Sequence, residues 1–236
     1  MHEGYEPGTA LVVVDVQNDF ADPSGGLAVA GAEAILPILN AEIAAARAGG
    51  AFVAYTQDWH PASTPHFAKD GGTWPIHCVG GTWGAELHPS LLADAGPSVR
   101  KGTNGEDGYS GFTMRDPLTG ATVPTELDGL LRSHGIHRVV IGGLATDYCV
   151  RATVLDALAL GYETHVLVEC VRPVEVTPGD GERALAEMAR AGAVLVRRSA
   201  GAPAADAAAH GATPAPAGHA GTPTPAGLAG LAEGTP

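Results

Sequence analysis

The stretch LVVVDVQNDF, residues 11–20, opens with four bulky apolar residues and then becomes polar. Consecutive β-branched residues favour an extended strand. A strand that is apolar at every position is typical of a parallel sheet covered on both faces. Asp15 follows the run directly. The stretch therefore predicts a central strand with a carboxylate at its carboxyl end.

The rest of the chain alternates similar strands with helices. Further apolar runs predict strands at residues 51–55, 139–141, 165–168 and 194–196, and we expect a short strand near residues 99–100. Apolar residues at helical spacing predict helices at residues 35–46, 125–133, 147–160 and 181–191. Such alternation builds βαβ units. We therefore expect an α/β fold, with a mostly parallel sheet of about six strands and helices on both faces, in a Rossmann-like three-layer arrangement. Ligands of such sheets bind beyond the carboxyl ends of the strands.

The composition predicts one globular domain followed by a tail. Residues 1–199 suit a single globular domain, whereas residues 200–236 consist largely of Ala, Pro, Gly and Thr. Such a segment buries too little apolar surface to offset its ordering entropy, so we expect a disordered tail. The three cysteines are too few for a disulfide framework.

Charge and hydropathy narrow the class of partner. A net charge of −13 argues against binding to nucleic acid or to a membrane surface, because both reward basic patches. The first residues, MHEGYEPGTA, lack the basic segment and apolar run of a signal peptide, and no stretch is apolar enough to span a bilayer. We expect a cytoplasmic enzyme that acts on a small molecule. The sequence does not decide whether this enzyme is a monomer or a homo-oligomer.

Three residues follow predicted strands where catalytic groups collect. Asp15 is either a turn cap or an acid–base group whose pKa burial would raise. Cys149, in GGLATDYCV, follows a predicted strand and begins a predicted helix. At a helix start the dipole favours a thiolate, and free N–H groups can hold an oxyanion. The alternative is a small thiol packed under that helix. Lys101 is a surface lysine or the cation beside this thiol. Each alone fits a structural role, and their combination favours catalysis.

The aperiodic segment after the second predicted strand carries a candidate metal site. Its donors are one carboxylate and three imidazoles, from Asp58, His60, His66 and His77. This N/O set suits Zn²⁺, Fe²⁺ or Mn²⁺, although a single histidine in a loop is more often a satisfied polar residue. Nearby aromatic residues are candidate walls for a flat substrate, or ordinary packing residues. They are Phe20, Trp74 and Tyr109.

Six motifs together carry a resemblance over residues 8–199. They are VVVDVQNDF, QDWH followed by His66, WPIHCV, RKG, YSGF and GLATDYCV. In this order and spacing, the chain resembles the bacterial nicotinamidases of the isochorismatase-like cysteine hydrolase superfamily. Tyr148 departs from the histidine that some relatives carry before the nucleophile, and the tail has no counterpart.

The resemblance implies a role for each candidate residue. It implies a catalytic triad of Asp15, Lys101 and Cys149. It implies a cis peptide bond between Leu144 and Ala145, and an oxyanion hole from the N–H groups of Ala145 and Cys149. It implies one divalent metal ion (Zn, Fe or Mn) on Asp58, His60, His66 and His77, and substrate contacts from Phe20, Trp74 and Tyr109.

The implied reaction is the hydrolysis of nicotinamide to nicotinate and ammonia through a Cys149 thioester, in NAD salvage, with pyrazinamide as a second substrate. In this reaction the metal positions the substrate. One alternative is another small-amide or carbamoyl amidohydrolase of the same superfamily. A second is a hydrolase in which a metal-bound water attacks and Cys149 is structural. A third is a non-catalytic metal-binding protein.

Overall fold

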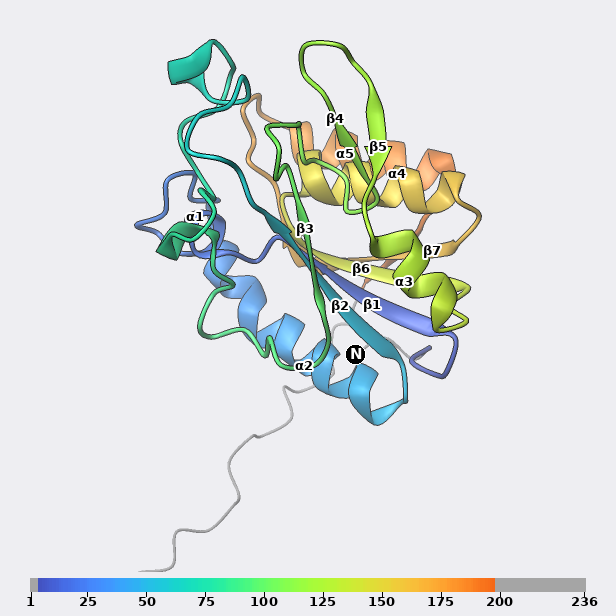
Figure 1. The fold of residues 1–236 in the computed structure, drawn as a ribbon. Coiled ribbons are helices and arrows are strands. Elements are labelled where there is room, and N and C mark those ends of the chain that lie inside the picture. The colour runs from blue at the N-terminus through green and yellow to red at the C-terminus, as the bar shows by residue number, and fades with distance from the viewer. Residues whose placement is uncertain (1–3, 198–236) are drawn as a thin grey trace, which may run out of the picture. The chain divides into compact units, whose positions relative to one another are not determined.

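Six parallel strands form the central sheet of the computed structural model, which describes residues 4–197 (Figure 1). Their order in space is β3 (Ser98–Lys101), β2 (Phe52–Asp58), β1 (Thr9–Val14), β6 (Arg138–Leu144), β7 (Glu163–Arg172) and β8 (Val194–Val196). The chain winds outward from β1 in one direction and then from β6 in the other. Such a reversal opens a crevice at the carboxyl ends of the two central strands. The predicted sheet is confirmed.

Helices cover both faces of this sheet, as predicted (Figure 1). Helix α2 (Leu36–Ala48), preceded by a 3-10 turn at Ala32–Ile35, lies on one face. The other face carries α3 (Leu127–Ser133), α4 (Arg151–Ala159) and α5 (Asp180–Ala191).

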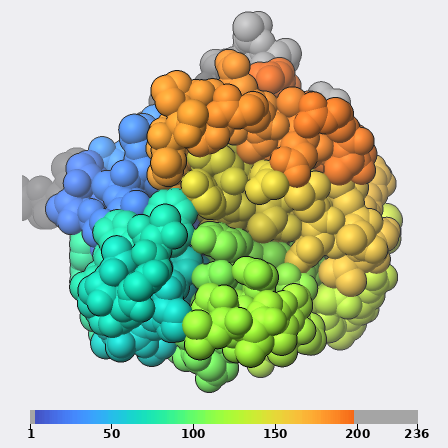
Figure 2. All heavy atoms as spheres, turned by 90° about the horizontal axis from the view of Figure 1, so that it is seen from above, coloured from blue at the N-terminus to red at the C-terminus, as the bar shows by residue number. Residues whose placement is uncertain are grey.

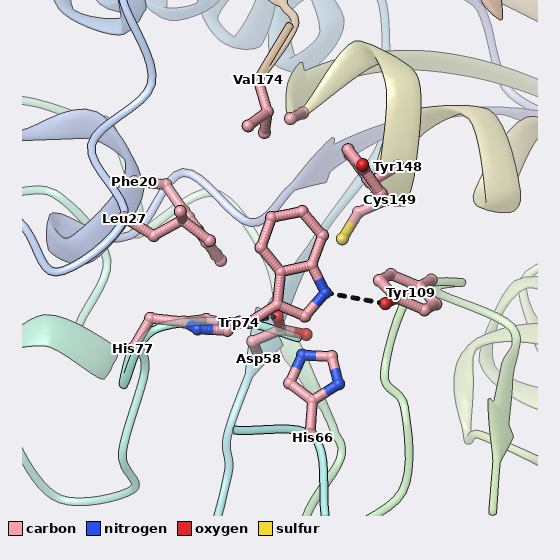
Figure 3. A pocket seen from close by; sticks show the side chains of 11 residues that line it. Phe20, Leu27, Asp58, His66, Trp74, His77, Tyr109, Tyr148, Cys149 and Val174 are labelled. Atoms are coloured by element: carbon pink, nitrogen blue, oxygen red, sulfur yellow. Dashed lines mark hydrogen bonds and ion pairs between the residues drawn. The ribbon is translucent and has the colours of Figure 1, made fainter. Parts of the chain in front are cut away.

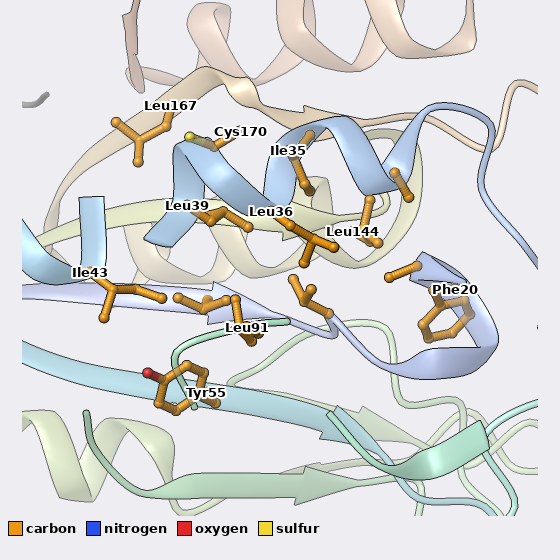
Figure 4. Close-up of a cluster of buried hydrophobic side chains, with 14 of the residues drawn as sticks. Phe20, Ile35, Leu36, Leu39, Ile43, Tyr55, Leu91, Leu144, Leu167 and Cys170 are labelled. Carbon is orange, nitrogen blue, oxygen red and sulfur yellow. The ribbon is translucent and has the colours of Figure 1, made fainter. Parts of the chain in front are cut away.

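Strand β1 contributes to the core on both faces because successive side chains of a strand point in opposite directions. Leu11 and Val13 pack in the core on the α2 side, together with Leu39 and Ile43 (Figure 4). Val12 packs in the opposite core. All six residues of β1 are buried, which is the environment that its apolar run predicts.

Short elements complete the described chain. They are α1 (Asn18–Ala21), 3-10 turns at Ala68–Asp70 and Trp83–Ala85, a π-helical turn at Thr146–Val150, and an antiparallel hairpin of β4 (Thr113–Arg115) and β5 (Thr122–Pro124). The hairpin was not predicted, because its residues are largely exposed and show no apolar alternation. The helix expected at residues 147–160 begins as the π-helical turn and becomes α-helical only at Arg151.

Among residues 4–197, the structure has no helix that is both long enough and apolar enough to cross a membrane. The predicted tail, residues 200–236, lies outside the described residues, as do the last residues of the predicted domain.

Candidate active site

The register of the sheet brings the strand-end residues together. Asp58 and Lys101 are paired in the parallel register of β2 and β3. Asp15 follows β1, and its N–H donates to the carbonyl of Thr56 on β2 at 3.2 Å. Cys149 follows β6, the strand on the other side of β1. The four residues therefore lie at the carboxyl ends of four adjacent strands.

The ammonium group of Lys101 lies at the centre of this cluster. Its Nζ is 2.7 Å from Oδ2 of Asp15, 2.6 Å from Oδ1 of Asp58 and 3.6 Å from Sγ of Cys149. It also donates to the carbonyl of Gly108. Burial alone would lower the pKa of Lys101, but the two carboxylates raise it well above its usual value. The lysine is therefore a permanent cation that faces two acids and a thiol.

The two carboxyl groups differ in their affinity for a proton. Burial raises the pKa of Asp15 to about 6, although Lys101 and a 2.6 Å hydrogen bond from the Thr56 hydroxyl both favour its ionised form. Burial would also raise the pKa of Asp58, but Lys101 and His60 lower it below its usual range. Asp15 is thus suited to accept and return a proton near neutral pH, whereas Asp58 stays ionised.

Cys149 corrects one expectation from the sequence. Burial raises the pKa of its thiol well above the usual value, despite the opposing charge of Lys101, and a hydrogen bond with Asp15 raises it further. The thiolate expected from a helix start is therefore not favoured in the resting site, because the thiol lies desolvated in a π-helical turn. A base must take its proton before the sulfur can attack, and Asp15 is in contact with it.

The backbone before Cys149 has the conformation that the resemblance implies. The peptide bond between Leu144 and Ala145 is cis. The carbonyl of Ala145 accepts hydrogen bonds from the N–H groups of Tyr148 (3.2 Å) and Val150 (3.0 Å), which flank Cys149 in the turn.

The side chain of Gln17, which was not predicted as a site residue, places Asp58. Its Nε2 donates to the carbonyl of Asp58 at 2.7 Å, and its Oε1 accepts from the N–H of Asp58 at 2.8 Å. The same Nε2 donates to the carbonyl of Ala85 at 2.9 Å. The amide therefore fixes the backbone of Asp58 at the point where β2 ends.

Three imidazoles lie together beside Asp58, and two of them approach its second carboxylate oxygen. Donor atoms of His60, His66 and His77 lie within 4.8 Å of one another, and all three residues are buried. Oδ2 of Asp58 is 3.6 Å from Nε2 of His60 and 3.8 Å from Nε2 of His77. The four predicted ligands thus form one group, and Asp58 connects it to Lys101.

At least one nitrogen of each imidazole is available to a metal ion. Nδ1 of His77 lies 2.8 Å from the carbonyl of Pro75, and Nδ1 of His66 lies 2.7 Å from Oδ1 of Asp107. Neither ring nitrogen of His60 has a hydrogen-bond partner among the described residues. Buried polar atoms without a partner are costly, and a cation would satisfy them. Burial lowers the pKa of His77 to about 4, which keeps it in the neutral form that binds metals. The donor set fits Zn²⁺, Fe²⁺ or Mn²⁺.

A pocket joins the thiol to the imidazoles (Figure 3). The indole of Trp74 lies at its centre and donates a 2.9 Å hydrogen bond to the hydroxyl of Tyr109. The three aromatic residues predicted as substrate contacts all line it. The full lining is Phe20, Leu27, Asp58, His66, Trp74, His77, Tyr109, Ala145, Tyr148, Cys149 and Val174.

Three lining residues, Leu27, Tyr148 and Val174, were not among the predicted site residues. Leu27 and Val174 lie in loops, where no periodicity marks them. Tyr148 adjoins the nucleophile and packs edge-on against Trp74, with ring centroids 4.8 Å apart.

Seen from above, the segments that build the pocket meet around a recessed area of the surface (Figure 2). They are the loop after β2 in teal, the loop before β4 in green and the turn after β6 in yellow.

The chain is similar to proteins of known activity. The isochorismatase domain family matches residues 9–200. A nicotinamidase of Escherichia coli strain K12 is 40% identical over 206 residues, covering 80% of this chain and 94% of that protein. The structure of a pyrazinamidase of Pyrococcus horikoshii in complex with zinc is similar at a TM-score of 0.72 and 41% identity, covering 81% of this chain and 100% of that one. PnC1 from L. infantum in complex with nicotinate is similar at a TM-score of 0.74 and 36% identity, covering 81% and 93%.

Proposed function

The chain belongs to the isochorismatase family, and from this premise we propose that it hydrolyses nicotinamide to nicotinate and ammonia through a thioester at Cys149. One observation carries the proposal. A single aromatic-lined pocket contains the thiol at one side and the imidazole group at the other, with Lys101 and Asp15 in contact with the thiol beneath it.

The side chains account for each proton in the proposed reaction. Asp15 takes the proton of the Cys149 thiol, and the thiolate attacks the carboxamide carbon to form a C–S bond. The N–H groups of Ala145 and Cys149 hold the resulting oxyanion. The C–N bond then breaks as protonated Asp15 gives its proton to the amino group, which departs as ammonia, and a thioester remains on Cys149.

Hydrolysis of the thioester restores the enzyme. Asp15 takes a proton from water as the water oxygen attacks the thioester carbon. Collapse of this second tetrahedral species breaks the C–S bond, returns the Asp15 proton to the sulfur and releases nicotinic acid, which ionises to nicotinate. Lys101 stays charged throughout and stabilises the Asp15 carboxylate and the Cys149 thiolate.

The metal group and the aromatic residues serve recognition in this proposal. Asp58, His60, His66 and His77 would hold one divalent ion, whose charge attracts the ring nitrogen of the substrate. Phe20 and Trp74 flank the ring.

The test is ammonia release from nicotinamide by the metal-loaded protein and by Cys149→Ala. We expect the variant to lose essentially all activity while a matched variant of a second buried thiol, Cys170→Ala, retains it. Substantial activity of Cys149→Ala would instead favour attack by a metal-bound water. Comparison with pyrazinamide and N-carbamoyl amides tests the substrate: negligible turnover of nicotinamide beside rapid turnover of a carbamoyl amide would favour another amidohydrolase of the family.

We further propose a cytoplasmic enzyme whose partner is this small-molecule amide rather than nucleic acid or a membrane, which the net charge of −13 supports. Light scattering in solution measures whether the protein is a monomer or a homo-oligomer.

A further inference from the structure

We infer that Asp107 belongs to the metal centre as a positioning residue that fixes the tautomer and orientation of His66. The inference deepens the proposed function and rests on its metal site. Asp107 lies 41 positions from His66 in the chain, and no sequence pattern connects the two.

The contact itself determines which nitrogen of His66 is free. Oδ1 of Asp107 lies 2.7 Å from Nδ1 of His66, and the side chains are 14% and 4% exposed. An ionised carboxylate only accepts hydrogen bonds, so Nδ1 carries the proton and donates it. Nε2 therefore keeps its lone pair. A carboxylate behind a ligating imidazole also makes the ligand more basic and holds its ring in place.

Asp107 is itself held by the hairpin. Its N–H donates to the carbonyl of Arg115 on β4 at 2.7 Å, and its carbonyl accepts from the N–H of Arg115 at 3.1 Å. Nη1 of Arg115 lies 3.8 Å from Oδ2 of Asp107. One carboxylate oxygen is thus directed to His66 while the other faces an arginine, which gives this hairpin a role at the site.

The two residues that follow Asp107 contact the other parts of the site. The carbonyl of Gly108 accepts a hydrogen bond from Lys101, and the hydroxyl of Tyr109 accepts one from Trp74. Residues 107–109 therefore touch a metal ligand, the buried cation and the aromatic wall in succession. This placement favours a role in the site over that of a surface carboxylate that happens to meet a histidine.

The experiment measures zinc affinity directly, by competition with a chromophoric chelator on the full-length protein. We expect Asp107→Asn to bind zinc about 10-fold more weakly and Asp107→Ala up to about 100-fold more weakly, the range for carboxylates behind metal-binding histidines. Asp107→Glu should restore part of the affinity. Asp116→Asn is the matched control, because the half-buried Asp116 side chain accepts its hydrogen bonds from the N–H groups of Leu118 and Thr119 within the hairpin turn.

A double-mutant cycle separates this role from a general effect on folding. If Asp107 acts through His66, Asp107→Asn should not weaken zinc binding further in a His66→Ala background. The visible absorption of the cobalt-substituted protein should change in Asp107→Asn and not in Asp116→Asn. Unchanged zinc affinity and an unchanged cobalt spectrum in Asp107→Asn would overturn the inference, as would an equal loss of affinity in both backgrounds.

The same measurements distinguish this inference from the proposed function. A wild-type protein that binds zinc through His66 but leaves nicotinamide intact refutes the activity and leaves the role of Asp107 standing. A wild-type protein that binds none of Zn²⁺, Fe²⁺ and Mn²⁺ refutes the role of Asp107 and the metal site, while ammonia release tests the thioester reaction separately.

Discussion

Thr56→Val removes a hydroxyl that donates a 2.6 Å hydrogen bond to Oδ1 of Asp15. This bond favours the ionised carboxylate and opposes burial, which raises the pKa of Asp15 to about 6. In the proposed reaction the ionised form accepts the thiol proton. Activity is therefore present above this pKa and is lost as the pH falls through it, and the substitution should move that loss to higher pH.

The size of the shift follows from the strength of the bond. A hydrogen bond to a charged group contributes about 1.5–3 kcal/mol and one pH unit equals about 1.4 kcal/mol, so at the lower end of this range the inflection should rise by about one unit. The ionised fraction at about pH 6 then falls from roughly one half to roughly one tenth, a loss of about fivefold in kcat/KM. At about pH 8 the two proteins should differ by only roughly 10%.

The assay is kcat/KM for nicotinamide between about pH 5 and 9, with metal content measured at each point. Thr164→Val is the control, because this buried hydroxyl donates to the carbonyl of Tyr162 at 3.0 Å and lies near the amino end of β7, where Thr164 is paired with Val139 of β6. It should leave the inflection in place. An inflection that stays the same in Thr56→Val, or a loss at high pH as large as the loss at low pH, would refute the assignment of Asp15 as the base.

Lys101→Met removes the cation between the buried carboxylates of Asp15 and Asp58. Denaturant titration should therefore show a free energy of unfolding that is lower by about 3–5 kcal/mol, and ammonia release should fall to background. A stable, active variant would contradict this. Gly143→Ala places a Cβ 2.0 Å from a carbonyl oxygen of β1 at a φ of 124°, and we expect little folded protein on expression. Gly129→Ala on α3 meets nothing within 4 Å, so the same titration should show a gain of about 0.5–1 kcal/mol. Chelation of the metal should lower Tm, and added zinc should restore it in a concentration-dependent way; a Tm that ignores both would argue against a metal site.

The central strands β1, β2 and β6 could be predicted because they are buried on both faces and their runs are largely apolar. Their ends could not be predicted as well. The strand expected at residues 51–55 continues through Thr56, Gln57 and Asp58, which are polar yet buried. Hydrogen bonds across the site, such as those from Gln17 to the backbone of Asp58, stabilise them in place of apolar packing. Polar residues that end a predicted strand can therefore be its last residues when they belong to a site.

The candidate site could be predicted by residue type, but its supporting contacts could not. Asp58 and the three histidines stand out because four metal donors in one loop are unusual. Asp107 carries no such signal, because it meets His66 only after the hairpin has folded against the loop. The raised pKa of the Cys149 thiol likewise depends on burial by distant segments, which a helix-start argument does not contain.

Asp58 is the last residue of β2 and the first predicted metal ligand along the chain. It therefore stands between a part of the site that is attached to the sheet and a part that is attached to a loop. The groups around the thiol are attached to strand ends, whereas the three imidazoles come from residues 60–77, a described segment whose regular structure is one short 3-10 turn. Metal release should therefore open this segment locally without opening the sheet. In hydrogen exchange, zinc should slow the amides of residues 60–77 and leave those of β1 and β6 unchanged. An enzyme built this way loses activity when zinc is scarce and regains it on resupply, with no need to refold.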